Sequence, residues 1–138
     1  GVNNMARNLI SVGNIVFDCH YHVVWCTKYR LPLLKDGADE ELKEIVSEVA
    51  DEMNATVEEM EVMPDHVHIL LQCHPDHVCK IVRAMKGRSS RLLRQQFPFI
   101  KSRTPSLWTR SYFIATAGGA PLSIIKKYVQ SQKKRREQ

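Results

Sequence analysis

The sequence predicts an α+β fold in which helices pack on one face of an antiparallel sheet. Extended segments rich in β-branched and aromatic residues alternate with segments whose apolar residues recur at helical spacing. Their order is β-α-β-β-α-β followed by one more helix, which is the order of a ferredoxin-like (RRM-like) sheet. The 138 residues suffice for one compact domain. We therefore expect a single domain over 1–138, with a flexible N-terminal tail at 1–8.

The first half of the chain supplies the first part of this order. Residues 15–27 are rich in β-branched and aromatic types, which predicts a strand. Between 42 and 53 the apolar residues lie on one face of a helical pattern, and acidic residues fill the other face. Residues 55–63 and 66–73 are then expected to form two strands joined by a tight turn.

The second half of the chain completes the order. A helix is expected over 76–96, and it could break near Gly87 because glycine weakens helices. Residues 98–105 are expected to form a loop, and residues 108–116 a fourth strand. A last helix is expected from 121 to about 136, since proline is favourable in a first turn. The face of the sheet away from the helices would then be free for a ligand or a second subunit.

Charge is divided unevenly along the chain. Residues 1–70 hold 5 Lys/Arg against 13 Asp/Glu, a net charge of −8, whereas residues 71–138 hold 15 against 2, a net charge of +13. A positive field of that density attracts phosphate backbones and releases their counterions. Nucleic acid is therefore the leading partner. The alternatives are a solvated basic face or binding to an anionic membrane surface.

The hydropathy pattern predicts a cytoplasmic protein with no membrane partner. No apolar run reaches the roughly 18 residues that a membrane span needs, and the polar start lacks the apolar stretch of a signal peptide. The four cysteines are expected to be reduced. Cys73, His74, His77 and Cys79 lie close together, but their spacing matches no structural zinc pattern.

Two histidine pairs are candidate metal ligands. His66 and His68 flank one apolar residue in an expected strand, so their side chains point to the same face. Their Cα atoms would lie roughly 6.6 Å apart, close enough for both imidazoles to reach one divalent ion. His20 and His22 have the same spacing, which cannot separate the two pairs. Taken alone, such a pair is more often a pair of surface histidines.

The last predicted helix offers a nucleophile. Ile124, Tyr128 and Gln132 stand four residues apart, so they project from one helical face. A core aromatic is the commoner explanation of such a position, but Gln132 and the nearby lysines make a poor interior surface. A phenol has a pKa of about 10, so it needs help to attack a phosphate at neutral pH. A divalent ion, Mg²⁺ or Mn²⁺, held by His66, His68 and the Gln132 carbonyl oxygen could supply that help.

Four blocks of sequence together resemble the single-tyrosine HUH transposases of small bacterial and archaeal insertion sequences, the IS200-like transposases. HUH denotes two histidines around a hydrophobic residue. The blocks are 21–30, 63–71, 107–113 and 128–132, and they follow one another in the order of the family. The resemblance covers nearly the whole chain, with no departure at the positions that match the nucleophile and the metal ligands.

The resemblance implies a metal-dependent transposase. In that family a tyrosine, here Tyr128, attacks a phosphate of single-stranded DNA, forms a 5′-phosphotyrosine link and frees a 3′-hydroxyl. That hydroxyl later attacks another such link, so no ATP is needed. The resemblance also implies a homodimer with composite active sites and a DNA hairpin near the element ends as partner. Gly118 and Gly119 would suit a hinge before the tyrosine helix.

Basic residues in and around the second helix are expected to contact DNA phosphates, which position the DNA without reading its sequence. They are Lys28, Arg30, Lys80, Arg83, Lys86, Arg88, Arg91, Arg94, Lys101, Arg103 and Arg110. Trp108 or Tyr112 could stack on an unpaired base, although aromatic residues in strands usually belong to the core.

Two other functions remain compatible with the residues. One is a non-catalytic nucleic-acid-binding ferredoxin-like module, which would present aromatic residues to unstacked bases. The aromatic-rich signature of that class is absent. The other is a hydrolytic metal-dependent nuclease that uses water as nucleophile and leaves no covalent adduct.

Overall fold

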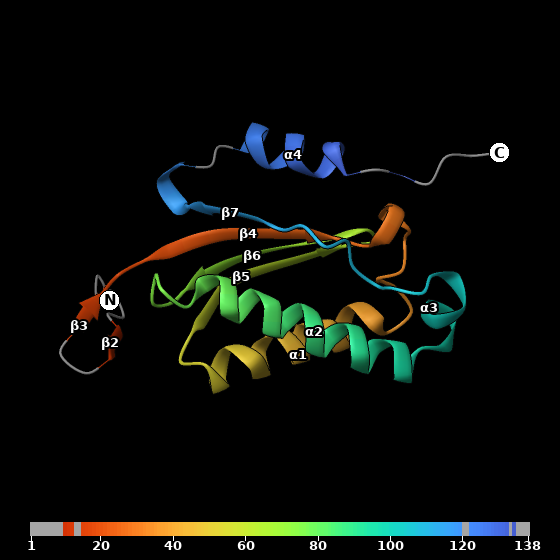
Figure 1. Ribbon diagram of the computed structural model, residues 1–138, viewed down its shortest axis with the longest axis horizontal. Coiled ribbons are helices and arrows are strands. Elements are labelled where there is room, and N and C mark those ends of the chain that lie inside the picture. Colours follow the sequence, from red (N-terminus) through yellow and green to blue (C-terminus); the bar gives the residue numbers. More distant parts are fainter. Residues whose placement is uncertain (1–9, 13–14, 120–121, 133, 135–138) are drawn as a thin grey trace.

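Four strands form one antiparallel sheet with helices on both faces (Figure 1). The computed structural model describes residues 10–12, 15–119, 122–132 and 134. The strands are β4 (His20–Cys26), β5 (Thr56–Met63), β6 (His66–Gln72) and β7 (Phe113–Thr116). Their order across the sheet is β5-β6-β4-β7. Because this is the order of a ferredoxin-like sheet, the predicted α+β fold is confirmed.

Two long helices cover one face of the sheet and build the main core with it. α1 spans Ala38–Glu52 and α2 spans Val78–Gln96, and both lie below the sheet in Figure 1. Alternate residues of the central strands point toward these helices and are fully buried: Val23, Trp25, Val67, Ile69 and Leu71. Burial of one such side chain contributes about 1.5–3 kcal/mol. The alternation therefore fixes which residues of β6 face the other way.

α2 runs without a break through the expected weak point at Gly87. Ser89, in the middle of the helix, is buried, and its hydroxyl accepts a hydrogen bond from the Trp108 indole N–H at 3.0 Å. A serine that satisfies a buried donor stabilises the packed helix despite its modest helix propensity. The same contact places Trp108 in the core rather than on a base-stacking surface.

The single strand expected over 15–27 is instead two strands. β3 (Ile15–Phe17) pairs with β2 (Ile10–Val12) in a separate two-stranded sheet, and β4 begins after a break at 18–19. Asp18 accepts a hydrogen bond from the ring of His20. Aspartate is a poor strand former, and here its side chain forms a polar cluster with His20 and Glu58 at the start of β4.

The loop expected over 98–105 contains a short helix, α3 (Pro98–Arg103). Pro98 stands in the first turn, where the missing N–H of a proline has no helical partner to lose. The loop prediction for this segment was therefore wrong, because a proline in a first turn does not oppose a helix. The next proline, Pro105, lies beyond the end of the helix.

The fourth strand is shorter than expected. β7 begins at Phe113, whereas the strand was expected from 108. Before β7, Trp108 forms a single bridge to Thr27, and the carbonyls of residues 109–111 accept hydrogen bonds from a lysine of α2 instead of from β4. An extended pattern therefore does not guarantee sheet pairing when a side chain competes for the backbone.

α4 (Leu122–Ser131) lies across the face of the sheet opposite α1 and α2 (Figure 1). Ile125 and Val129 pack against Val24 and Cys26 of β4 in a second, smaller core. The expectation that this face is free is therefore wrong. The apolar stripe of the last helix needs a surface to bury, and the outer face of β4 supplies it.

Short 3₁₀ turns follow two of the strands, namely η1 (Lys28–Arg30) after β4 and η2 (Ala117–Gly119) after β7. The expected tail at 1–8 lies outside the described residues, as do the start of the last helix at 121 and its end near 136. Within the described ranges, no helix combines the length and the apolar character needed to cross a membrane.

Candidate functional site

His66 and His68 lie on the face of the sheet that α4 covers. They alternate along β6 with Val67 and Ile69, which are buried against α1 and α2. Both imidazoles line a groove of about 450 Å³, and the residues of its other wall belong to α4. We call it the histidine groove. It is lined by Arg30, Glu61, Met63, His66, His68, Leu122, Ile125, Lys126, Val129 and Gln130.

A carboxylate orients His66. Its Nδ1 donates a hydrogen bond to Asp65 Oδ1 at 2.7 Å, and the Arg30 Nε–H donates to the other Asp65 oxygen at 3.2 Å. Burial alone would raise the pKa of the Asp65 carboxyl, but His66 and Arg30 together hold it below its ordinary value. With Nδ1 protonated by this contact, Nε2 of His66 keeps a lone pair for a ligand.

His68 is paired with a third histidine. Its Nε2 lies 2.9 Å from Nδ1 of His22, with the two ring centroids 5.1 Å apart. Burial, and then the neighbouring His22, lower the pKa of His68 below its ordinary value. His68 is therefore a neutral imidazole at pH 7, which is the form that binds metal ions.

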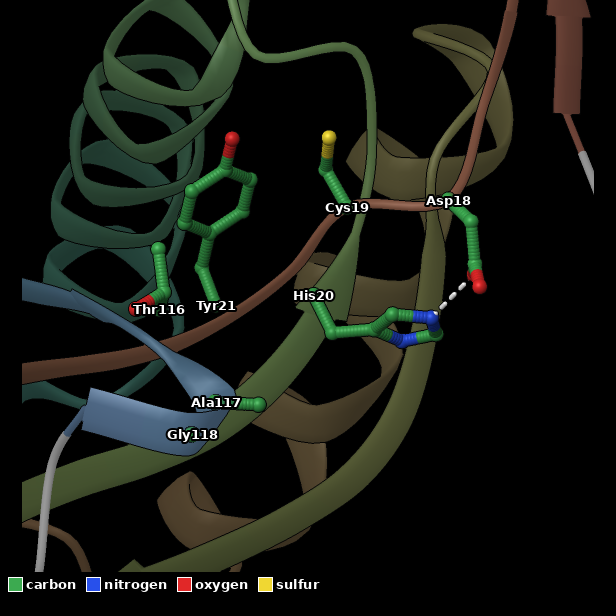
Figure 2. Close-up of a pocket in the computed structure, with 7 residues that line it drawn as sticks. All are labelled: Asp18, Cys19, His20, Tyr21, Thr116, Ala117 and Gly118. Carbon is green, nitrogen blue, oxygen red and sulfur yellow. Dashed lines mark hydrogen bonds and ion pairs between the residues drawn. The ribbon is translucent and has the colours of Figure 1, made fainter.

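His20, which shares a strand and a spacing with His22, does not line this groove. Figure 2 shows its ring turned toward Asp18, on the wall of a second pocket of about 280 Å³. The other ring nitrogen of His20 donates a hydrogen bond to the Glu58 carboxylate. Burial lowers the pKa of His20, but the hydrogen bonds to Glu58 and Asp18 raise it by more. Because both ring nitrogens donate to carboxylates, His20 has no lone pair for a metal ion.

Tyr128 and Gln132 stand together, as their spacing predicts, but around a hydroxyl that the sequence did not single out. Ser111 Oγ lies 2.7 Å from the Tyr128 hydroxyl and donates to Gln132 Oε1 at 2.9 Å. Thr109 Oγ1 also reaches Gln132 Oε1, at 3.4 Å. The Tyr128 ring leans on Phe113, with the centroids 5.5 Å apart. Burial raises the pKa of the phenol above its ordinary value, so it is protonated at neutral pH.

The structure keeps the two halves of the predicted site apart. Neither Tyr128 nor Gln132 is among the residues that line the histidine groove. Within the described ranges, no hydrogen bond joins either of them to His66 or His68. One side of α4, with Ile125 and Val129, lines the groove, whereas Tyr128 projects from another side and contacts Ser111.

The histidine groove has the donor chemistry of a divalent-metal site. His68 is neutral, and His66 is held by a carboxylate behind it, as metal-bound histidines usually are. Glu61 lies opposite His68 in the register of β5 and β6 and lines the same groove, so it adds negative charge. Among the described residues, no three His, Cys, Asp or Glu side chains converge closely enough to hold an ion. An ion bound here would need further ligands of another kind, such as an amide oxygen or water.

Several basic residues expected to bind DNA have partners inside the molecule. Arg88 forms two hydrogen bonds with Glu52, both of 2.7 Å. Arg94 donates to the Thr104 carbonyl at 2.6 Å, and Arg30 is held by Asp65. These contacts join neighbouring elements and leave less of each guanidinium for a phosphate.

Other basic residues are free to meet a ligand. Lys80, Arg83 and Arg91 are exposed along α2, and the described part of the chain offers them no ion pair. Arg91, Arg94 and Lys101 surround a hollow of about 220 Å³ where α2 meets α3. The remaining expected contacts, Lys28, Arg103 and Arg110, lie in or beside η1, α3 and β7, with Arg103 and Arg110 exposed.

This architecture recurs in known proteins. The family model described as transposase, IS200-like, matches residues 15–132. The chain belongs to the IS200-like transposase family. ISDra2 transposase TnpA of Deinococcus radiodurans is 38% identical over 120 residues, covering 85% of this chain and 86% of that protein. The transposase for insertion sequence element IS200 of Salmonella typhimurium is 29% identical over 125 residues, covering 88% and 82%.

Solved structures of transposases share the fold. A crystal structure described as a transposase of Deinococcus radiodurans matches with a TM-score of 0.82 at 34% identity, covering 91% of this chain and 99% of that one. A REP-associated tyrosine transposase bound to a REP hairpin matches with a TM-score of 0.56 at 12% identity, covering 89% and 68%. The second likeness is one of fold alone. Membership of the IS200-like family makes this chain a DNA-processing enzyme.

Proposed function

We propose that this IS200-like transposase cleaves and rejoins single-stranded DNA through a covalent link to Tyr128. A divalent metal ion, Mg²⁺ or Mn²⁺, would be held by His66, His68 and Gln132. One observation carries the proposal: the groove lined by His66 and His68 has α4 as its other wall, and α4 carries Tyr128 and leads into Gln132. Neighbouring elements therefore carry the two kinds of group that the reaction needs, a nucleophile and metal ligands.

The histidines would bind the metal ion and hold it in place, and the ion would act as a Lewis acid on the scissile phosphate. When bound, the ion would polarise the scissile phosphate and stabilise charge on the departing oxygen. His66 keeps its orientation through Asp65, and His68 stays neutral because it is buried beside His22. His68 can therefore offer a lone pair without first losing a proton at pH 7.

The phenol oxygen of Tyr128 would be the nucleophile. Its attack forms a bond to phosphorus and breaks the bond from phosphorus to the 3′-oxygen of the DNA. The proton lost by the phenol balances the one gained by the departing 3′-hydroxyl. Rejoining is the reverse exchange with a different 3′-hydroxyl, so the number of ester bonds is conserved and no ATP is consumed.

The position of Tyr128 supports an enzyme with composite sites. Its hydroxyl faces Ser111 rather than the histidine groove of its own chain. Attack on a phosphate at that groove therefore needs another placement of the tyrosine helix. We infer a homodimer in which the helix of one subunit serves the groove of the other. Gly118 and Gly119 precede α4, and glycine tolerates the backbone changes that such an exchange needs.

The proposed substrate is single-stranded DNA that carries a hairpin near the ends of an insertion sequence. The REP-associated relative of the same fold is bound to a hairpin. In this chain the net charge of +13 over residues 71–138 and the exposed cations of α2 and α3 favour a phosphate-rich ligand.

One denaturing gel tests the proposed function. A labelled single strand with a hairpin is incubated with protein and Mg²⁺, and the mixture is denatured before electrophoresis. The proposal predicts a labelled band at the mass of protein plus DNA. Free cleaved ends without that band would indicate a hydrolytic nuclease, and uncleaved DNA would indicate a non-catalytic binding module. Either outcome would overturn the tyrosine mechanism.

Free and paired arginines of α2 should differ in their effect on DNA binding. Arg83→Ala should weaken single-strand binding and reduce the slope of log affinity against log salt by about 0.7, the value for one phosphate contact. Arg88→Ala should have a smaller effect, because Glu52 already neutralises that guanidinium. Fluorescence anisotropy at several salt concentrations measures both. Equal changes in slope would show that the Glu52 pair opens on DNA.

A further inference from the structure

Lys86 turns inward from the middle of α2. Its ammonium group donates hydrogen bonds to the backbone carbonyls of Thr109 (2.7 Å), Ser111 (3.0 Å) and Arg110 (3.3 Å). A lysine ammonium has three protons, so the three consecutive carbonyls use all of its donors. The side chain is half-buried beside Tyr112, with Nζ 5.2 Å from the ring centroid. No donor is left over for a DNA phosphate in this arrangement.

The lysine and the 109–111 segment hold each other in place. Burial lowers the pKa of the Lys86 ammonium to about 8, because loss of hydration destabilises the charged form. The carbonyl dipoles replace part of the lost hydration. The Thr109 N–H donates to the Cys26 carbonyl at 3.0 Å, but the carbonyls of the segment do not enter the ladder between β4 and β7. The ammonium therefore supplies the hydrogen bonds that these carbonyls accept.

The side chains of the same segment hold the proposed nucleophile and amide ligand. Ser111 has a single hydroxyl proton, and it donates that proton to Gln132 Oε1, which can only accept. At its other contact the serine oxygen must therefore accept, so the Tyr128 hydroxyl is the donor. Thr109 adds a second hydroxyl to Gln132 Oε1. A chain of hydrogen bonds thus runs from α2 through the segment to the tyrosine helix.

We propose that Lys86 is a positioning residue for Tyr128 and Gln132, acting through the 109–111 segment. The ammonium fixes the backbone of that segment, and the backbone sets where the Ser111 hydroxyl stands. The role of the phenol and the amide in this inference rests on the proposed function, whereas the way they are held follows from the geometry alone. Lys86 thereby has a different task from the exposed lysine of the same helix, Lys80, which faces solvent.

Hydrogen exchange in the protein without DNA tests the positioning directly. Lys86→Met keeps the apolar stem and removes the ammonium, and Lys80→Met removes the same charge from the exposed side of α2. In Lys86→Met, amides of 112–116 and of α4 should exchange at least about fivefold faster, because the net contribution of one hydrogen bond is of that size and three are lost. Lys80→Met should exchange like the wild-type protein in both regions.

A second variant separates positioning from loss of fold. Ser111→Ala leaves the lysine and the carbonyls in place and removes only the hydroxyl that reaches α4. It should speed exchange in α4 but not in 112–116. The double variant Lys86→Met with Ser111→Ala should exchange in α4 no faster than Lys86→Met alone, because both changes break the same chain of contacts.

Activity gives a third readout that a DNA-contact role would not produce. At saturating single-stranded DNA, Lys86→Met should form adduct about tenfold more slowly, while its dissociation constant for DNA stays within about twofold of wild type. Lys80→Met should show weaker binding of single-stranded DNA, with exchange in α4 unchanged. If Lys86→Met instead weakens binding as Lys80→Met does, with α4 exchange unchanged, Lys86 is a phosphate contact and the inference is overturned. If the wild type forms no adduct, the proposed function fails, and the exchange data still decide how α4 is held.

Discussion

A Tyr128→Phe variant is expected to bind single-stranded DNA with wild-type affinity and to form no covalent adduct. The change removes one oxygen and its contact with Ser111, but the ring still packs on Phe113, so the fold and the DNA surface should be retained. Only the atom that would become bonded to phosphorus is lost. The adduct should therefore fall below detection on a denaturing gel, while anisotropy shows unchanged binding.

A second tyrosine gives the matched control for this variant. Tyr29 lies in η1 with its ring beside Lys28, it does not line the histidine groove, and Tyr29→Phe should form adduct at the wild-type rate. Ser111→Ala is informative as well, because it removes the hydroxyl that accepts the phenol proton but leaves the nucleophile intact. An adduct that persists in Tyr128→Phe would mean that another residue attacks the DNA.

Replacing either groove histidine is expected to abolish metal-dependent cleavage. His66→Ala or His68→Ala removes one of two imidazole ligands, and the loss of several kcal/mol of charge stabilisation corresponds to about 10³-fold in rate or more. Initial cleavage rates over a series of Mg²⁺ and Mn²⁺ concentrations measure the effect. Asp65→Asn should act through His66 and lower the apparent metal affinity by about 10- to 100-fold.

His20→Ala is the control for the histidine variants. His20 has the same spacing in the sequence as the groove pair, but its nitrogens are occupied by Asp18 and Glu58. Its removal should leave the metal response unchanged. The histidine assignment would be wrong if His20→Ala lost the response while His66→Ala kept it.

Mixing two inactive variants tests whether the sites are composite. Tyr128→Phe lacks the nucleophile and His66→Ala lacks a ligand, so neither homodimer should form adduct. In a mixed dimer with shared sites, the histidines of the first variant can work with Tyr128 of the second. Adduct should reappear on the His66→Ala chain alone, which a size tag identifies. No recovery would indicate that each chain uses its own tyrosine.

The fold was predictable because apolar residues recur with the period of a strand or of a helix in most of its elements. The alternation of Val67 and Ile69 with the histidines of β6 fixed both the core face and the ligand face. In α1, apolar residues at helical spacing opposite a row of acidic residues predicted the helix and its buried face. The errors lie where tertiary contacts override local pattern. Residues 109–111 look like part of a strand, but Lys86 takes their carbonyls.

The candidate site was only partly predictable for a related reason. His66, His68, Tyr128 and Gln132 carry recognisable spacings, so the sequence could nominate them. Their supporting partners come from distant parts of the chain and have no spacing that points to them. For Ser111 the one available signal was its place inside a block that resembles the family, whereas His22 was a candidate only as a metal ligand paired with His20. Glu61 became visible only once the register of β5 and β6 was known.

Peptide mapping of the covalent complex identifies the residue that becomes joined to DNA. Wild-type protein is reacted with a hairpin-bearing single strand, treated with nuclease and protease, and examined by mass spectrometry. The peptide containing Tyr128 should gain the mass of a 5′-linked nucleotide, and this gain should require the divalent metal. A nucleotide attached to any other residue, or cleavage of the strand with every peptide unmodified, would contradict the assignment of Tyr128 as the nucleophile.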